Sequence, residues 1–162
     1  MFEIATIAAG GKPDLYRSVA QQLEGLLAGE RDAIANAANM AALIFHTLPD
    51  LNWAGFYLLK GGELVLGPFQ GKPACIRIPV GRGVCGTASE RMASVIVPDV
   101  HAFPGHIACD SASRSELVVP LVREGQVFGV LDLDSPSPKR FDEADRDGCE
   151  ELVRIYLSAS DL

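Results

Sequence analysis

The sequence of 162 residues lacks a long apolar run, a cluster of basic residues and any C-x-x-C pair of cysteines. A membrane-spanning helix needs about 20 consecutive apolar residues, and no segment approaches that length. Lys and Arg number 14 against 21 Asp and Glu, which gives a formal net charge of -7. Nucleic acids and anionic membranes bind basic patches, so we expect neither as a partner and expect a small molecule or another protein instead.

The first 14 residues, MFEIATIAAGGKPD, contain only a short apolar patch, with the acidic Glu3 and no basic leader. A secretory signal peptide begins with a basic segment, so this stretch is a poor candidate and we expect a cytoplasmic protein. Because the cytoplasm keeps thiols reduced, the four cysteines are not expected to form a structural disulfide framework.

Hydrophobic residues make up 48% of the chain and charged residues 22%, a balance typical of a folded globular domain. Helical spacing of apolar residues predicts helices near 15–26 and 32–48, the second with Ile34 on its inner face, and a last helix from Asp142. Strands are predicted at 52–59, 63–71, 74–80, 94–99, 116–125 and 126–135. Helices that bracket hairpin-linked strands favour an α+β fold, with a largely antiparallel sheet flanked by helices, in one domain over residues 1–162.

The segment GRGVCG places Gly81, Gly83 and Gly86 in a G-x-G-x-x-G pattern after a predicted strand. A dinucleotide fingerprint has this pattern, but it also requires a longer helix and alternating βαβ units, which the sequence does not predict. Two interpretations remain: a tight turn that needs glycine dihedrals, or a small anion site formed by backbone N–H groups at a helix N-terminus. The second would suit the carboxylate of a small ligand.

The four cysteines differ in their surroundings. Cys149 shares a helical stripe with Leu152, Val153 and Tyr156, which favours a buried structural thiol. Cys109 lies in a predicted loop, after two histidines and before a stretch rich in Ser and Arg, where polar neighbours can lower the pKa of a thiol. Cys109 is therefore our candidate for the reactive cysteine; the alternative is a loop cysteine without a functional role.

The sequence supports a metal site less strongly than it supports a reactive cysteine. His106 and Cys109 have chelate spacing, and Cys75 or Cys85 could complete a set of ligands. Structural zinc sites use two closely spaced pairs of ligands, and the sequence offers no second pair. We therefore expect no metal.

Three carboxylates stand out in the second half of the sequence. Glu116 opens a predicted strand, and Asp132 and Asp134 alternate along LDLDS, so that both side chains point to one face of the sheet. They form either a solvated face or a site in which one acid has a raised pKa and the others attract an ammonium group. Trp53 and Tyr57 are core residues by default, but they could also form an apolar wall of such a site.

Four segments, in order, resemble the free methionine-(R)-sulfoxide reductases, a branch of the GAF-domain fold: NWAGFYLL, LVLGPFQGKPACIRIPVGRGVCGTA, DVHAFPGHIACDSASRSE and GVLDLDS. The resemblance runs from about Asn52 to Ser135, and it is the combination that is specific rather than any one segment. It implies a GAF-like fold and an enzyme that converts free L-methionine-(R)-S-oxide to L-methionine by cysteine chemistry.

By this resemblance, Cys109 is the thiolate that attacks the sulfoxide sulfur and is left as a sulfenic acid. Cys75 or Cys85 then condenses with it to a disulfide; the resemblance favours Cys75, and sequence spacing cannot choose. A thioredoxin-type dithiol reduces that disulfide, with NADPH as the electron source through thioredoxin reductase and with no bound cofactor. The family resemblance also allows a homodimer.

The resemblance, together with charge, suggests how the substrate is held. Glu116 or Asp134 would protonate the sulfoxide oxygen, and Asp132 with its neighbours would hold the substrate ammonium. Backbone N–H groups around Val84 to Gly86 would hold the carboxylate, while aromatic side chains would line the pocket for the methyl group and sulfur. The expected substrate-binding residues are Trp53, Tyr57, Val84, Cys85, Gly86, Glu116, Asp132 and Asp134.

The alternative function belongs to another class: a GAF-type sensor module that binds a small ligand without chemistry, because one fold hosts many functions. We expect no effector domain for such a sensor to signal to, and three of the cysteines are spread through the predicted pocket segments. The reductase is therefore the preferred interpretation.

Overall fold

The computed structural model describes residues 2–5 and 10–162. Residue 1 and residues 6–9 lie outside the described residues, and with them part of the apolar N-terminal stretch and of the expected domain over residues 1–162. None of the helices in the described part of the chain is long and apolar enough to cross a membrane.

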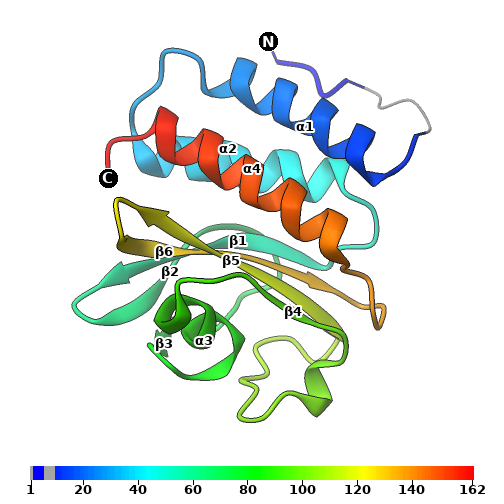
Figure 1. Cartoon of the computed structure of the whole chain (residues 1–162), viewed down its shortest axis with the longest axis vertical. Coiled ribbons are helices and arrows are strands. Elements are labelled where there is room, and N and C mark those ends of the chain that lie inside the picture. Colours follow the sequence, from blue (N-terminus) through cyan, green and yellow to red (C-terminus); the bar gives the residue numbers. More distant parts are fainter. Residues whose placement is uncertain (1, 6–9) are drawn as a thin grey trace.

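A curved antiparallel sheet separates two layers of the molecule (Figure 1). Its strand order is β3-β2-β1-β6-β5-β4. In chain order the strands are β1 (Trp53–Lys60), β2 (Glu63–Gly71), β3 (Arg77–Pro79), β4 (Val95–Val97), β5 (Ser115–Arg123) and β6 (Gln126–Ser135). The hairpins β1–β2 and β5–β6 were both predicted, and the pairing of β1 with β6 joins them at the centre of the sheet.

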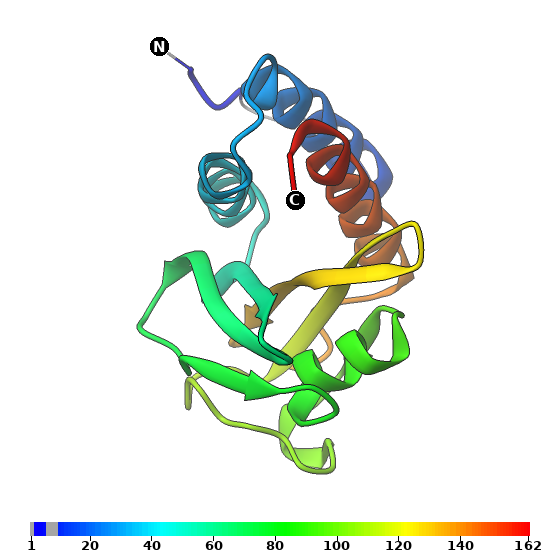
Figure 2. The same ribbon diagram turned by 90° about the vertical axis from the view of Figure 1, so that its left-hand side faces the viewer.

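Helices α2 (Ala33–Thr47) and α4 (Glu143–Ala159) cover one face of the sheet, and α1 (Lys12–Leu27) packs against these two helices (Figure 1). The shorter α3 (Gly83–Arg91) lies on the other face (Figure 2). A 3-10 turn (Val100–Ala102) begins the long loop that leads from β4 to β5. This architecture confirms the expected α+β fold, with helices flanking a largely antiparallel sheet.

Helix α4 begins at the predicted cap, whereas the buried face of α2 differs from the prediction. Asp142 caps α4 in a capping box with Asp145, as the sequence predicts for a helix that starts there. In α2 the prediction for Ile34 is wrong, because its side chain is 50% exposed. The helix is rotated so that Asn36 faces inward, where its side-chain amide donates a hydrogen bond to Ser160 Oγ.

A buried carboxylate ties α1 to α4. Asp145 has no exposed surface, and its oxygens accept hydrogen bonds from Lys12, Arg140 and the Tyr16 hydroxyl. A buried charge is tolerated only when it is paired and hydrogen-bonded, which these three donors achieve. This cluster fixes the helical layer on the side of the sheet away from α3.

The alternation of side chains along the central strands sorts residues onto two faces. Phe56 of β1 and Leu133 of β6 belong to the core beneath the three long helices. Tyr57 of β1 and Val130 of β6 belong to a smaller core under α3 and the long loop. The sheet therefore presents two apolar faces, and the second is where the polar residues of interest lie.

The segment before β3 departs from the prediction. A strand was expected over 74–80, but pairing with β2 is confined to Arg77–Pro79. The chain from Lys72 to Cys75 crosses over the second face instead, because the backbone carbonyls of both residues accept hydrogen bonds from aromatic side chains of β1. This crossing brings Cys75 toward the loop that carries Cys109.

Candidate active site

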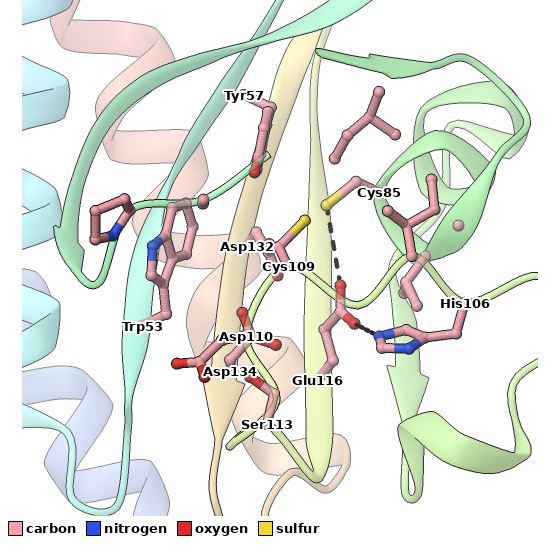
Figure 3. A pocket seen from close by; sticks show the side chains of 16 residues that line it. Trp53, Tyr57, Cys85, His106, Cys109, Asp110, Ser113, Glu116, Asp132 and Asp134 are labelled. Carbon is pink, nitrogen blue, oxygen red and sulfur yellow. Dashed lines mark hydrogen bonds and ion pairs between the residues drawn. The ribbon is translucent and has the colours of Figure 1, made fainter. Parts of the chain in front are cut away.

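A pocket lies on the second face of the sheet, bounded by α3, by the segment before β3 and by the long loop before β5 (Figure 3). Most of the residues expected to bind or react with substrate line it: Trp53, Tyr57, Val84, Cys85, Cys109, Glu116, Asp132 and Asp134. They come from β1, α3, β5, β6 and the loop before β5. The antiparallel register places Glu116 opposite Asp134 and Gly55 opposite Asp132.

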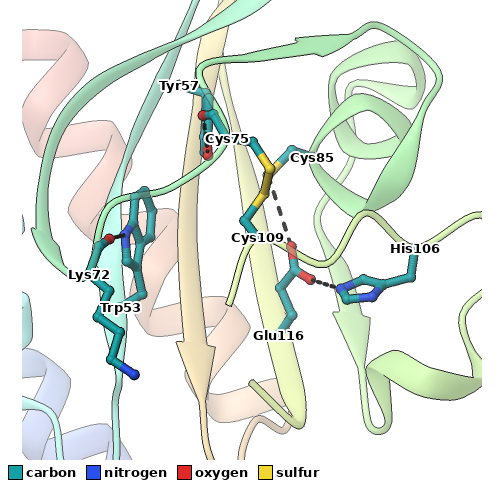
Figure 4. Close-up of a disulfide and its surroundings, with 8 residues drawn as sticks. All are labelled: Trp53, Tyr57, Lys72, Cys75, Cys85, His106, Cys109 and Glu116. Atoms are coloured by element: carbon teal, nitrogen blue, oxygen red, sulfur yellow. Dashed lines mark hydrogen bonds and ion pairs between the residues drawn. A yellow bond between two sulfur atoms is a disulfide. The ribbon is translucent and has the colours of Figure 1, made fainter. Parts of the chain in front are cut away.

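Cys75 and Cys109 form a disulfide, with their Cα atoms 5.4 Å apart and a sequence separation of 34 (Figure 4). It joins the crossing segment before β3 to the loop before β5. Cys109 lines the pocket, and both cysteines are only partly buried. The pair is the one that the family resemblance favours, and Cys85 is left as a free thiol.

Two aromatic side chains hold the segment that carries Cys75. Trp53 Nε1 donates to the carbonyl of Lys72 at 3.1 Å, and the Tyr57 hydroxyl donates to the carbonyl of Cys75 at 3.0 Å. The ring of Trp53 is stacked with those of Tyr57 and Phe69, at 5.9 and 5.2 Å between centroids. The two aromatic residues expected to line the substrate pocket therefore also position the disulfide.

The three carboxylates are withdrawn from water, so the alternative of a solvated face is wrong for them. Glu116 is 5% exposed and Asp132 is 6% exposed, and Asp134 is half-buried. Burial, and then the charge of a neighbouring carboxylate, raises the pKa of each acid well above its ordinary value. Ionisation of these buried acids is therefore unfavourable unless a cation lies beside them.

Glu116 lies between two further polar side chains. The Cys85 thiol donates to Glu116 Oε1 at 3.9 Å, and His106 Nε2 is 3.7 Å from Glu116 Oε2. Burial raises the pKa of the Cys85 thiol well above its ordinary value, so this thiol is protonated at neutral pH. Burial lowers the pKa of His106, which favours the neutral imidazole.

The glycine-rich segment forms a tight turn that leads into α3. Gly83 has a φ of +60°, and a Cβ on Gly86 would lie 2.4 Å from the carbonyl oxygen of Pro79. These constraints explain the glycines by backbone geometry, in agreement with the turn interpretation.

The expectation that Gly86 supplies a free N–H to a substrate carboxylate is wrong. Its N–H donates to the carbonyl of Arg82 at 3.0 Å, because the fourth residue of a helix already reaches back by one turn. Gly86 is also outside the pocket wall, whereas Gly83, Val84 and Cys85 are part of it. The N–H groups that an anion could reach at this helix start are those before Gly86.

Sequence reasoning missed a polar group beside Cys109. The Asn52 amide donates to Asp110 Oδ2 and to Ser113 Oγ, both at 3.1 Å, and thereby fixes the loop next to the disulfide. Asp110 and Ser113 line the pocket with the acids. The only signal for them was the loop HIACDSAS itself, in which polar residues directly follow Cys109.

Cys149 lies in the helical layer, away from the pocket. It is fully buried, and its thiol is 3.7 Å from the Tyr16 hydroxyl, to which it donates. Burial raises its pKa to about 12. The prediction of a buried structural thiol is confirmed.

The metal ligands considered from the sequence do not come together as a set, because Cys75 and Cys109 are joined to each other. A different set does: Cys85, Glu116 and Asp132 each place a ligand atom within 4.8 Å of the other two. This group lies on the floor of the pocket.

Comparison with known proteins agrees with this geometry. A family model described as GAF domain matches residues 35–159. Protein YtsP of Bacillus subtilis (strain 168) is 56% identical over 139 residues, which are 85% of this chain and 85% of that protein. The free methionine-R-sulfoxide reductase of Escherichia coli (strain K12) is 54% identical over 142 residues, 88% of this chain and 86% of that protein. The structure of free methionine-R-sulfoxide reductase from Neisseria meningitidis in complex with its substrate is similar with a TM-score of 0.93 at 47% identity, covering 98% of this chain and 95% of that chain.

Proposed function

We propose that this chain, which belongs to the GAF domain family, is an enzyme that reduces free methionine-(R)-sulfoxide to methionine. The observation that carries the proposal is the Cys75–Cys109 disulfide beside a pocket of buried acids. Relatives of that name, which are similar over most of their length, support it. A pocket built for ligand binding alone would have no need of two cysteines brought together from distant segments.

The pocket has the charges that a free amino acid requires. The ammonium group would lie against Asp132 and Asp134, and the carboxylate against the backbone N–H groups of Val84 and Cys85 at the start of α3. Trp53 and Tyr57 provide an apolar wall for the methyl group and sulfur. Both ends of a zwitterion are recognised, which favours a free amino acid over a residue within a peptide chain.

The chemistry begins with the thiolate of Cys109. It attacks the sulfoxide sulfur, the sulfur–oxygen bond breaks, and oxygen with one proton ends on Cys109 as a sulfenic acid while methionine leaves. The thiol of Cys75 then displaces water from this sulfenic acid, which forms the Cys75–Cys109 disulfide. One sulfoxide and two thiols thus give one thioether, one disulfide and one water, and the electrons balance.

The sulfoxide oxygen needs a proton as it is released, since expulsion of a bare oxide is very unfavourable. Glu116 is the preferred donor, because it is buried at the pocket and its raised pKa favours the protonated carboxyl group. The hydrogen bond from the protonated Cys85 thiol holds the carboxyl group in place. Asp134, whose pKa is also raised, is the alternative donor.

The disulfide must be reduced before the next turnover. A thioredoxin-type dithiol attacks one of its sulfurs and becomes oxidised in turn, with NADPH supplying electrons through thioredoxin reductase. The partial exposure of both cysteines is compatible with attack from outside. We place the reaction in the cytoplasm, where such dithiols are kept reduced, and propose no bound cofactor.

The decisive assay follows NADPH consumption with thioredoxin, thioredoxin reductase and separated R and S sulfoxides of free methionine. Cys109→Ser should abolish consumption with the R form, and Cys149→Ser is the matched control that should retain it. Retained turnover in Cys109→Ser would refute the assignment. A ligand sensor would instead bind the sulfoxide with its thiols unchanged, whereas the reductase loses the mass of two hydrogens as the disulfide forms.

A further inference from the structure

The floor of the pocket brings together three side chains of the types that bind metals. One ligand atom from each of Cys85, Glu116 and Asp132 lies within 4.8 Å of the other two, and all three residues are buried. The Cys85 sulfur is 3.9 Å from Glu116 Oε1. A tetrahedral zinc ion, with bonds of about 2.3 Å to sulfur and about 2.0 Å to oxygen, would set these two atoms about 3.5 Å apart. Small side-chain movements would therefore close this group around one ion.

A buried oxygen of Asp132 is a second observation that indicates a cation at this group of side chains. Its Oδ1 atom is buried and has no hydrogen-bond partner among the residues that the structure describes, and the residue is only 6% exposed. A buried acceptor left unpaired costs about 1–3 kcal/mol, and buried charges are normally paired or coordinate metals. In Figure 3 the Asp132 side chain lies in the same pocket as Glu116 and Cys85.

His106 lies beside this group, although it is not one of the residues whose ligand atoms are all within 4.8 Å of one another. Its Nε2 atom is 3.7 Å from Glu116 Oε2, and the residue lines the pocket from the loop side. A set of thiolate, imidazole and carboxylates suits zinc, whereas magnesium and calcium require oxygen ligands alone. The ligand types therefore select the class of cation.

We propose that Cys85, Glu116 and Asp132 form a binding site for zinc, which a movement of the His106 side chain toward the ion would complete. Binding exchanges protons for the metal: the Cys85 thiol loses its proton to solvent as the sulfur–zinc bond forms, and nothing is oxidised. Because the ion would occupy the floor of the pocket, zinc and methionine sulfoxide should exclude each other. Only that last consequence rests on the proposed function.

The test is a calorimetric titration of zinc chloride into protein first oxidised to the Cys75–Cys109 disulfide, so that these two cysteines cannot ligate. One equivalent of zinc should bind, and repeating the titration in buffers of different ionisation enthalpy should reveal proton release. Loss of a residue that only hydrogen-bonds a metal ligand lowers metal affinity by about 10–100-fold. Cys85→Ser removes a proposed ligand itself, so it should weaken zinc binding by at least that factor. Cys149→Ser is the matched control, since it removes a buried thiol in the helical layer, and it should bind zinc as the unmodified protein does.

Asp132→Asn gives a second variant in case Cys85→Ser fails to fold, and circular dichroism checks both. Cobalt(II) as a probe should give a thiolate charge-transfer band with the unmodified protein and none with Cys85→Ser. Absence of stoichiometric binding, or unchanged affinity in the folded variants, would overturn the proposal. These measurements do not depend on catalysis, so their result does not affect the assignment of the reductase reaction.

Discussion

The hydroxyl of Tyr57 donates a hydrogen bond to the backbone carbonyl of Cys75 at 3.0 Å, across 18 residues of sequence. This bond links a pocket-lining side chain on the central strand β1 to the segment that carries one sulfur of the disulfide. Together with the bond from Trp53 to Lys72, it holds Cys75 within reach of Cys109. The geometry makes Tyr57 a positioning residue for the second half of the proposed reaction.

Tyr57→Phe should slow closure of the disulfide while sparing the first step. A hydrogen bond of this kind contributes about 0.5–1.5 kcal/mol, so closure should slow by about two- to tenfold. In a single turnover, methionine release should stay close to normal while dimedone traps more sulfenic acid at Cys109. Tyr156→Phe is the control, because its hydroxyl makes the same type of bond to the carbonyl of Ala33 in the helical layer. Equal trapping in both variants would contradict the positioning role.

Glu116→Gln should lower turnover by about 100-fold or more if Glu116 is the proton donor, since general acids contribute about 10²–10⁴-fold. Glutamine keeps the shape of the side chain but cannot deliver the proton, so the thermal unfolding midpoint should change far less than the rate. The coupled NADPH assay measures the rate, with Glu63→Gln at the exposed start of β2 as the control. Unchanged turnover in Glu116→Gln together with a large loss in Asp134→Asn would move the role to Asp134.

The layout of helices and hairpins could be predicted from residue patterns, because apolar spacing and glycine turns mark these elements directly. Ile34 was misplaced because spacing does not fix how a helix is rotated on its neighbours; the bond from Asn36 to Ser160 decided it. Likewise, alternation showed that Asp132 and Asp134 share a face, but only the cover by α3 and the long loop makes that face a pocket.

The pairing of the cysteines was beyond residue-level prediction. Cys75 and Cys85 are both upstream of Cys109, and nothing in their spacing distinguishes them. The difference arises from tertiary contacts: Cys75 is on a crossing segment held by aromatic side chains, whereas Cys85 is buried inside α3 against Glu116. Family resemblance supplied the preference for Cys75 that the residues alone could not.

Asp145→Asn should strongly destabilise the protein without touching the pocket. The carboxylate is fully buried and accepts hydrogen bonds from Lys12, Arg140 and Tyr16, so its loss leaves two cations without their shared partner. Removing one member of a buried ion pair costs about 3–5 kcal/mol, which urea unfolding would measure. Glu151→Gln is the control, because this acid pairs with Arg154 at the surface and its loss should change little. A small effect for Asp145→Asn would mean that the cluster does not hold α1 to α4.

Asp142 should make the stability of the helical layer depend on acid pH. The hydrogen bond from Lys12 lowers the pKa of Asp142 from its ordinary 3.8 to about 2 in the folded protein. A folded pKa below the unfolded one means that the ionised carboxylate stabilises the fold at pH above about 4, and that this contribution disappears as the pH falls through about 2. Since the side chain is largely exposed, solvent screening limits the contribution to about 1 kcal/mol or less. Asp142→Asn retains a good helix cap and removes only the charge, so urea unfolding should separate it from the unmodified protein at pH 7 and not at pH 2. A difference that persisted at pH 2 would assign the effect to the cap rather than to the ion pair.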